Sequence, residues 1–131
     1  MLGPLRGLKV LDFSTLLPGP MATLFLAEAG AEVIKVERPG SGEDMRYYPP
    51  KWGDSSINFS LLNRGKKSIA VDLKNEEERA KLIPLIEEAD IIVEQFRPGV
   101  MSRLGLDYEA IKSINSKIIY CSISGFGQNG P

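Results

Sequence analysis

The apolar positions near the start of the chain change period twice. An apolar run over residues 8–13 predicts a strand, small and apolar residues 21–29 predict a helix, and residues 31–36 predict a second strand. Pro20 suits a first helical position, because its fixed backbone angle is helical and the N–H that it lacks would be unpaired there. Gly30 suits the helix end, where glycine adopts the left-handed conformation without a Cβ clash. The pattern predicts a βαβ unit with parallel strands.

Strand-like and helix-like segments alternate along the rest of the chain. The predicted strands lie at 68–73, at 90–94 and from Lys117, and the predicted helices start at Asn75 and cover 100–104 and 108–114. This order favours an α/β fold, with a mostly parallel sheet and flanking helices, in a single domain.

The helix that starts at Asn75 carries its own boundary signals. The Asn75 side chain can cap the first turn, and Glu78 can reach back to it as in a capping box. Pro84 cannot donate the expected backbone hydrogen bond, so we expect it to kink the helix or split it near Ala80.

The turns that follow the strands are the expected place for a ligand. Such sheets bind ligands at the carboxyl ends of their strands, where residues 14–20 and 37–40 should meet. Residues 37–63 lose periodicity and are rich in glycine, proline and aromatic residues, so we expect this loop to cover a ligand site or a partner surface.

Composition narrows the class of protein. The net charge of −1 gives no general attraction to nucleic acid or to an anionic membrane, and no apolar run approaches the roughly 20 residues that span a bilayer. We therefore expect a cytoplasmic protein with neither nucleic acid nor membrane as a partner. Cys121, the one cysteine, lies in a strand-like run and is expected to be a buried, inert thiol.

The chain contains no histidine. The commonest general base and metal ligand is therefore missing, and we expect neither a metal site nor a catalytic histidine from this chain. Dinucleotide binding is disfavoured as well, because Pro18-Gly19-Pro20 supplies one glycine where the fingerprint needs two or three.

Basic residues gather near the predicted strand ends. The interpretation as a solvated surface is open, and the functional alternative is an edge that binds a phosphorylated, nucleotide-like ligand. The residues concerned are Arg38, Arg64, Lys66, Lys67, Lys74, Arg97 and Arg103, with Phe96 as an apolar face for a base. Glu37, Asp44 and Glu94 lie near the same ends, and pairing with nearby Arg or Lys is favoured for them over acid–base chemistry.

Several separate blocks resemble, in order and spacing, the amino-terminal part of the family III CoA-transferases. This family is also called the carnitine-dehydratase and bile-acid-inducible type, and it includes α-methylacyl-CoA racemases. The blocks are residues 8–12, 18–20, 30–40, 63–68, 72–74, 96–101, 103–106 and 124–128.

The resemblance implies that residues 1–131 are the amino-terminal part of a Rossmann-like large domain that binds CoA thioesters. It also implies a homodimer, in the full-length protein, whose two chains are interlocked like linked rings. The positions that match CoA contacts in the family are Leu16, Arg38, Val71, Lys74, Gln95, Phe96, Arg103 and Leu104. Arg38 would lie by the adenine nucleotide, Val71 and Phe96 would form apolar walls, and Lys74 and Arg103 would meet phosphate charge.

The catalytic residues of the family have no match in this chain. We therefore expect the catalytic and small-domain segments to be absent and the chain alone to be inactive. The default activity of the family is transfer of CoA between carboxylic acids, with acyl-CoA and free acids as partners. The Leu17-Pro18-Gly19-Pro20 turn leans towards the racemase branch, and a non-catalytic CoA-binding or interaction module is a further alternative.

Overall fold

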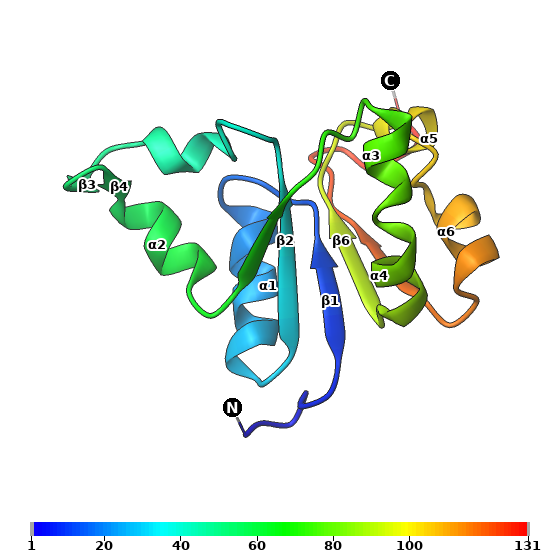
Figure 1. The fold of residues 1–131 in the computed structure, drawn as a ribbon, viewed down its shortest axis with the longest axis horizontal. Helices are drawn as coiled ribbons and strands as arrows, with labels where there is room; N and C mark the ends of the chain where they lie inside the picture. Colours follow the sequence, from blue (N-terminus) through cyan, green and yellow to red (C-terminus); the bar gives the residue numbers. More distant parts are fainter. Residues whose placement is uncertain (1, 131) are drawn as a thin grey trace.

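Five parallel strands form the central sheet of the computed structural model, which describes residues 2–130 (Figure 1). The spatial order is β5-β2-β1-β6-β7, and every neighbouring pair is parallel. The strands are β1 (Lys9–Asp12), β2 (Glu32–Glu37), β5 (Lys67–Ala70), β6 (Ile91–Glu94) and β7 (Ile119–Ser122). The predicted α/β class is confirmed. β5 is shorter than the predicted strand over residues 68–73, because the chain turns at Asp72, whose carboxylate accepts the backbone N–H of Lys74.

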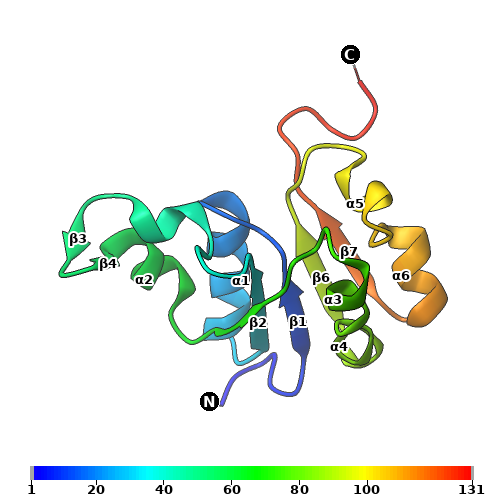
Figure 2. The ribbon, with the colours of Figure 1, turned by 45° about the horizontal axis from the view of Figure 1, so that its top comes forward.

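Helices cover both faces of the sheet (Figures 1 and 2). One face packs on α1 (Pro18–Glu28) through Val10, Val33 and Ala27. The opposite face buries Leu11 and Ile92 against the helical layer. That layer consists of α3 (Glu76–Ala80), α4 (Ile83–Glu88), α5 (Val100–Arg103) and α6 (Tyr108–Ile114). Side chains alternate between the faces of a strand, which explains why Val10 and Leu11 belong to different cores.

The first helix begins earlier than the sequence suggests. α1 starts at Pro18 with Leu17 as its N-cap, so Pro20 is the third helical residue and not the first. Pro18 meets the same physical requirement, because it too has a helical backbone angle and no N–H to satisfy. The expected end is confirmed: Gly30 has a φ of +105° just after the helix.

The helix predicted from Asn75 is split in two, as Pro84 requires. α3 ends at Ala80 and α4 begins at Ile83. Asn75 caps α3 by accepting the Glu78 backbone N–H at 3.1 Å. The predicted return bond of the capping box, from the Asn75 N–H to the Glu78 side chain, is wrong. The Asn75 N–H donates to the Asp72 carbonyl instead, and the Glu78 carboxylate pairs with Lys81.

The long segment after β2 is more ordered than a loop. It holds a 3-10 turn η1 (Asp44–Tyr47), a hairpin of β3 (Lys51–Trp52) and β4 (Ser55–Ser56), and α2 (Ile57–Asn63). In Figure 1 it forms the arm to the left of the sheet, and α2 packs against α1.

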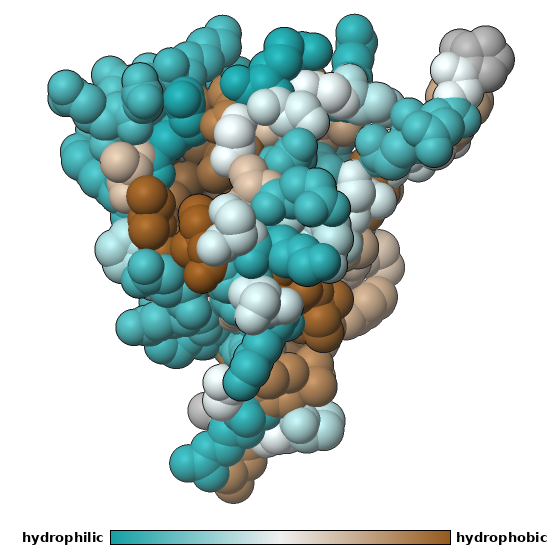
Figure 3. Space-filling view, turned by 90° about the vertical axis from the view of Figure 1, so that its right-hand side faces the viewer, coloured by the Kyte–Doolittle hydropathy of each residue, from teal (hydrophilic) through white to brown (hydrophobic). Residues whose placement is uncertain are grey.

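Cys121 is exposed, so the expectation of a buried thiol is wrong. It lies on β7, the edge strand, whose Ile119 is also 63% exposed. The burial of a residue on β7 depends on what packs against this edge strand, which the sequence of β7 does not reveal. Figure 3 looks onto this side of the molecule and shows apolar residues between hydrophilic ones. Within residues 2–130, no helix is both long and apolar enough to cross a membrane.

Candidate functional site

The eight predicted CoA contacts all lie beyond the carboxyl ends of strands. Leu16 follows β1, Arg38 follows β2, Val71 and Lys74 follow β5, Gln95 and Phe96 follow β6, and Arg103 and Leu104 lie at the end of α5. After β5 the chain crosses to α3, on the far side of β2 and β1 (Figure 1). The fold thus brings residues from distant parts of the sequence to one edge, here called the carboxyl edge.

These side chains differ in what they can offer a ligand. Arg38, Lys74 and Arg103 are exposed. Phe96 and Leu104 are half-buried and pack on the core, and Val71 is only 6% exposed within it. The carboxyl edge therefore presents exposed cations beside partly buried and buried apolar side chains.

Gln95 fastens the turn after β1 to the end of β6. Its Oε1 accepts the backbone N–H of Gly19 at 2.9 Å, and its Nε2 donates to the Thr15 carbonyl at 2.6 Å. Both ends of the amide are used, so the Gln95 side chain positions the turn. Leu16 lies inside this turn with a φ of +63°, which costs a non-glycine residue about 1 kcal/mol.

A buried carboxylate, Asp12, holds the same turn from beneath. It accepts the backbone N–H of Ser14 at 2.8 Å and the Thr23 hydroxyl at 2.5 Å, and it lies 3.3 Å from Lys66 Nζ. Lys66 Nζ also donates to the Pro20 carbonyl at 2.9 Å. Burial lowers the pKa of Lys66, and the nearby Asp12 partly opposes that shift. Lys66 is therefore part of the interior and not of a binding surface, contrary to the sequence expectation.

Glu37 is paired as expected. Its carboxylate accepts two hydrogen bonds from Arg46, at 2.6 and 2.7 Å, and one from the Ser68 hydroxyl at 2.7 Å. Burial alone would raise its pKa, but these bonds together with the Glu43 backbone N–H hold the pKa of Glu37 at about 2. Asp44 is also paired, with Arg38, at the exposed surface.

Glu94 has no cation partner within residues 2–130, which corrects the expectation of an Arg or Lys. The buried Glu94 carboxylate instead accepts the Ser122 hydroxyl and, at 2.9 Å, the Phe96 backbone N–H. It thereby ties the turn after β6 to the end of β7.

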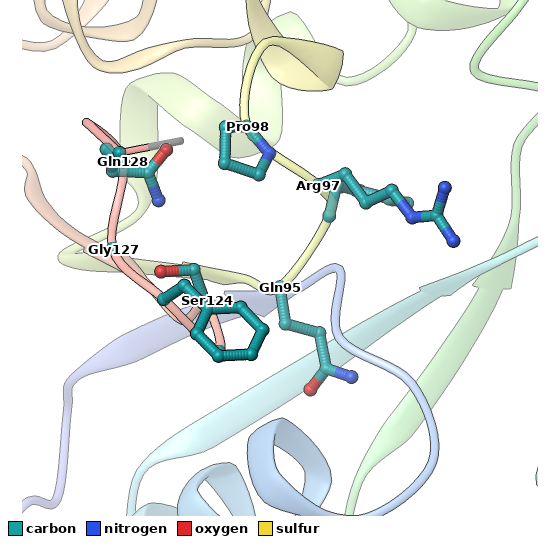
Figure 4. A pocket seen from close by; sticks show the side chains of 10 residues that line it. Gln95, Arg97, Pro98, Ser124, Gly127 and Gln128 are labelled. Atoms are coloured by element: carbon teal, nitrogen blue, oxygen red, sulfur yellow. The ribbon is translucent and has the colours of Figure 1, made fainter.

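The turn after β6 and the segment after β7 enclose a hollow of about 440 Å³. Residues 95–98 line one side, and residues of the glycine-rich 124–130 segment line the other. In Figure 4, Pro98 and Gln128 flank the hollow, Gln95 extends away towards the turn after β1, and Arg97 points away from Gln128. A second hollow, of about 300 Å³, lies beside Arg38 and is lined also by Arg46, Tyr47 and Ser68.

The cations at the two ends of the strands differ in their ion pairing. The side of the sheet where the strands begin, opposite the carboxyl edge, is here called the amino edge. At the amino edge, Lys9 pairs with Glu88, Arg64 with Glu28 and Lys67 with Glu32. The expectation that Arg64 and Lys67 join a binding edge is therefore wrong: Arg64 precedes β5 and Lys67 is its first residue, so both lie at the amino end of the strand. At the carboxyl edge, Lys74, Arg97 and Arg103 are exposed, and none forms an ion pair with a carboxylate of residues 2–130.

Sequence reasoning overlooked Lys35 and Glu43. Both are buried, and Lys35 Nζ lies 3.4 Å from Glu43 Oε2. A signal existed for Lys35, because a lysine within a strand covered on both faces requires a buried acceptor. None pointed to Glu43, which lies in the aperiodic segment. Among residues 2–130, no group of three or more His, Cys, Asp or Glu side chains could hold a metal ion.

Comparison with known proteins decides the family. The family described as CoA-transferase family III matches residues 5–131. The chain belongs to this family. Its relatives include the acetyl-CoA:oxalate CoA-transferase of Acetobacter aceti, 50% identical over 98% of this chain and 33% of the relative. The human succinyl-CoA:glutarate CoA-transferase is 49% identical over 98% of this chain and 30% of the relative.

Two solved structures are similar to this chain over nearly its whole length. A CaiB/BaiF family protein from Brucella suis superposes with a TM-score of 0.92 at 43% identity, covering all of this chain and 36% of that one. Rv3272 from Mycobacterium tuberculosis gives a TM-score of 0.91, also at 43% identity, covering 99% of this chain and 35% of that one. The chain thus spans about a third of the length of these relatives.

Proposed function

We propose that this chain is the CoA-binding amino-terminal part of an enzyme that transfers CoA between carboxylic acids. The observation that carries the proposal is the set of unpaired cations at the carboxyl edge. CoA brings a diphosphate and a 3′-phosphate, and Arg and Lys side chains that are not already paired can meet that charge without breaking an existing ion pair. The family and the transferases related to the chain support the same chemistry.

The eight contact residues take separate roles in this proposal. Lys74 and Arg103 meet phosphate oxygens, and Arg38 lies by the adenine nucleotide, exchanging Asp44 for the ligand. Phe96 and Leu104 form the apolar wall, with Val71 as its buried base. Leu16 contacts the ligand from the turn after β1, and Gln95 keeps that turn in place through Thr15 and Gly19.

The acyl-transfer step itself belongs, in this proposal, to residues outside 1–131. The chain spans about a third of its relatives and contains no histidine. We propose that the whole protein takes an acyl-CoA and a free carboxylic acid as substrates. Its active form would be a cytoplasmic homodimer of two interlocked chains.

Racemisation of α-methylacyl-CoA is the second candidate, and the turn after β1 favours it. Leu17, the N-cap residue of α1, is 54% exposed and offers an apolar surface to an acyl group. A transferase for small dicarboxylates would gain more from a hydrogen-bonding side chain at this position.

Calorimetric titration of the purified chain tests the CoA site. We expect CoA and acetyl-CoA to bind and NADH, a control nucleotide with no 3′-phosphate, to bind far more weakly. Binding of NADH as tight as that of CoA would contradict the proposal, as would a folded chain that binds neither. Assaying the chain alone with acetyl-CoA and short dicarboxylic acids should give no turnover; turnover would show that the catalytic groups lie within residues 1–131.

A further inference from the structure

Leu16 has a backbone conformation that its side chain does not favour. It is the only non-glycine residue with positive φ among residues 2–130. In the left-handed region the Cβ atom of an L-residue crowds the following carbonyl, so surrounding contacts must hold the residue there.

Glu43 supplies such a contact. Its Oε2 accepts the Leu16 backbone N–H at 3.0 Å, although the two residues are 27 positions apart in sequence. The same oxygen lies 3.4 Å from Lys35 Nζ, which donates to the Ser14 carbonyl at 2.9 Å. Lys35 and Glu43 therefore hold the two peptide groups on either side of Thr15.

Glu43 is fixed in turn by the end of β2. Its backbone N–H donates to Glu37 Oε2 at 2.9 Å, and Arg46 holds the same carboxylate. The segment that presents Arg38 and the turn that presents Leu16 thus share one set of hydrogen bonds. A shift of Glu43 would disturb both.

Burial of the Glu43 carboxylate carries a desolvation cost. It is 1% exposed, and its Oε1 has no hydrogen-bond partner among residues 2–130. Burial raises the pKa of Glu43 in spite of the nearby Lys35. An apolar residue of similar size would fill the space without leaving an oxygen unsatisfied, so filling space does not account for a glutamate here.

We propose that Glu43 is a positioning residue: by accepting the Leu16 amide it keeps Leu16 left-handed and sets the turn over residues 14–20 at the carboxyl edge. That the turn contacts CoA rests on the proposed function. The hydrogen bond and its effect on the turn do not.

Two substitutions separate the effect of the hydrogen-bond acceptor at Glu43 from the effects of its charge and its volume. Glu43→Gln keeps an oxygen for the Leu16 amide and removes the charge, whereas Glu43→Met keeps the size and removes the acceptor. Amide hydrogen exchange, followed by NMR, measures the protection of the Leu16 N–H by its hydrogen bond to Glu43. Calorimetry measures the affinity for CoA. We expect Glu43→Gln to stay within about threefold of the parent in both, and Glu43→Met to speed Leu16 exchange and weaken CoA binding by about tenfold or more.

The outcomes decide the proposal in each case. Unchanged Leu16 exchange in Glu43→Met would overturn it, and so would equal losses in the two variants, which would assign the effect to charge. If Glu43→Met does not fold, Leu16→Gly is added, because glycine adopts the left-handed conformation freely; recovered folding supports the proposal and continued unfolding overturns it. If the parent binds no CoA, the proposed function fails, while Leu16 exchange still decides the role of Glu43.

Discussion

Gly19 and Gln95 approach each other so closely that no side chain fits between them. The Gly19 N–H donates to Gln95 Oε1 at 2.9 Å, and a Cβ added at residue 19 would lie 2.5 Å from that oxygen and closer still to the Ser14 side chain. Gly19 lies in the first turn of α1, so the start of this helix is packed directly onto the ends of β1 and β6.

Gly19→Ala is therefore expected to destabilise the chain. Helix propensity alone predicts a gain of up to about 1 kcal/mol, because alanine is the better helix former. Overlap with Ser14 and Gln95 should reverse the sign and lower the free energy of unfolding by about 2 kcal/mol. Denaturant unfolding measures this. The matched control is Gly125→Ala, where an added Cβ meets nothing within 4 Å; a stabilised Gly19→Ala would show that the turn is not closely packed.

The sequence predicted those parts of the fold that depend on neighbours in the chain. The βαβ unit follows from periodicity, the break before α4 from Pro84, and α6 matches the predicted residues 108–114. Asn75 was predictable as a cap because its partner is three residues away. In each case the deciding interaction is local.

The parts that failed depend on tertiary contacts. The exposure of Cys121 is decided by the edge position of β7, and the burial of Lys66 by the packing of α1 over Asp12. The bond from Leu16 to Glu43 joins two irregular segments, neither of which has a period to read. At the candidate site, the eight predicted contact residues all lie beyond the carboxyl ends of strands, but the sequence could not identify the buried groups that hold the turns.

Acid should remove the contribution of Glu37 to stability. Its folded pKa of about 2 lies below the ordinary 4.5, so the stabilisation is complete above about pH 4.5 and is lost as the pH falls towards 2. The shift corresponds to about 3 kcal/mol. Arg46→Met should lower the free energy of unfolding by about 2 kcal/mol at pH 7, and by less at pH 3, where the unpaired Glu37 becomes protonated.

Arg38→Met is the matched control for this prediction. It removes an arginine from a pair that is exposed on both sides, Arg38 with Asp44, and should cost less than about 0.5 kcal/mol at either pH. Equal losses in the two variants, or a loss in Arg46→Met that does not depend on pH, would contradict the role assigned to the buried pair.

The cations at the two edges of the sheet should respond differently to removal. Arg103→Met and Lys74→Met are each expected to weaken CoA binding by about tenfold, because each removes a charge available to phosphate. Lys67→Met and Arg64→Met remove paired cations from the amino edge and should change affinity by less than about twofold. Calorimetry at two salt concentrations measures both sets. Similar losses in all four variants would indicate a general effect of net charge and no site.

Cys121 should react readily in the folded chain. It is exposed on the edge strand, so a disulfide reagent should modify it within about tenfold of the rate in denaturant, after correction for the effect of denaturant on the reagent. A native rate lower by about a thousandfold would mean that the outer side of β7 is covered in solution, for example by self-association, which sedimentation would detect.

The central claim is that CoA binds at the carboxyl edge, and an NMR titration of the isotope-labelled chain with CoA tests it most directly. We predict that the backbone amides of Leu16, Arg38, Lys74, Phe96 and Arg103 shift together as CoA is added, while those of Glu32, Lys67 and Glu88 at the amino edge do not. Shifts centred on the amino edge, or no shifts in a folded chain at millimolar CoA, would contradict the account.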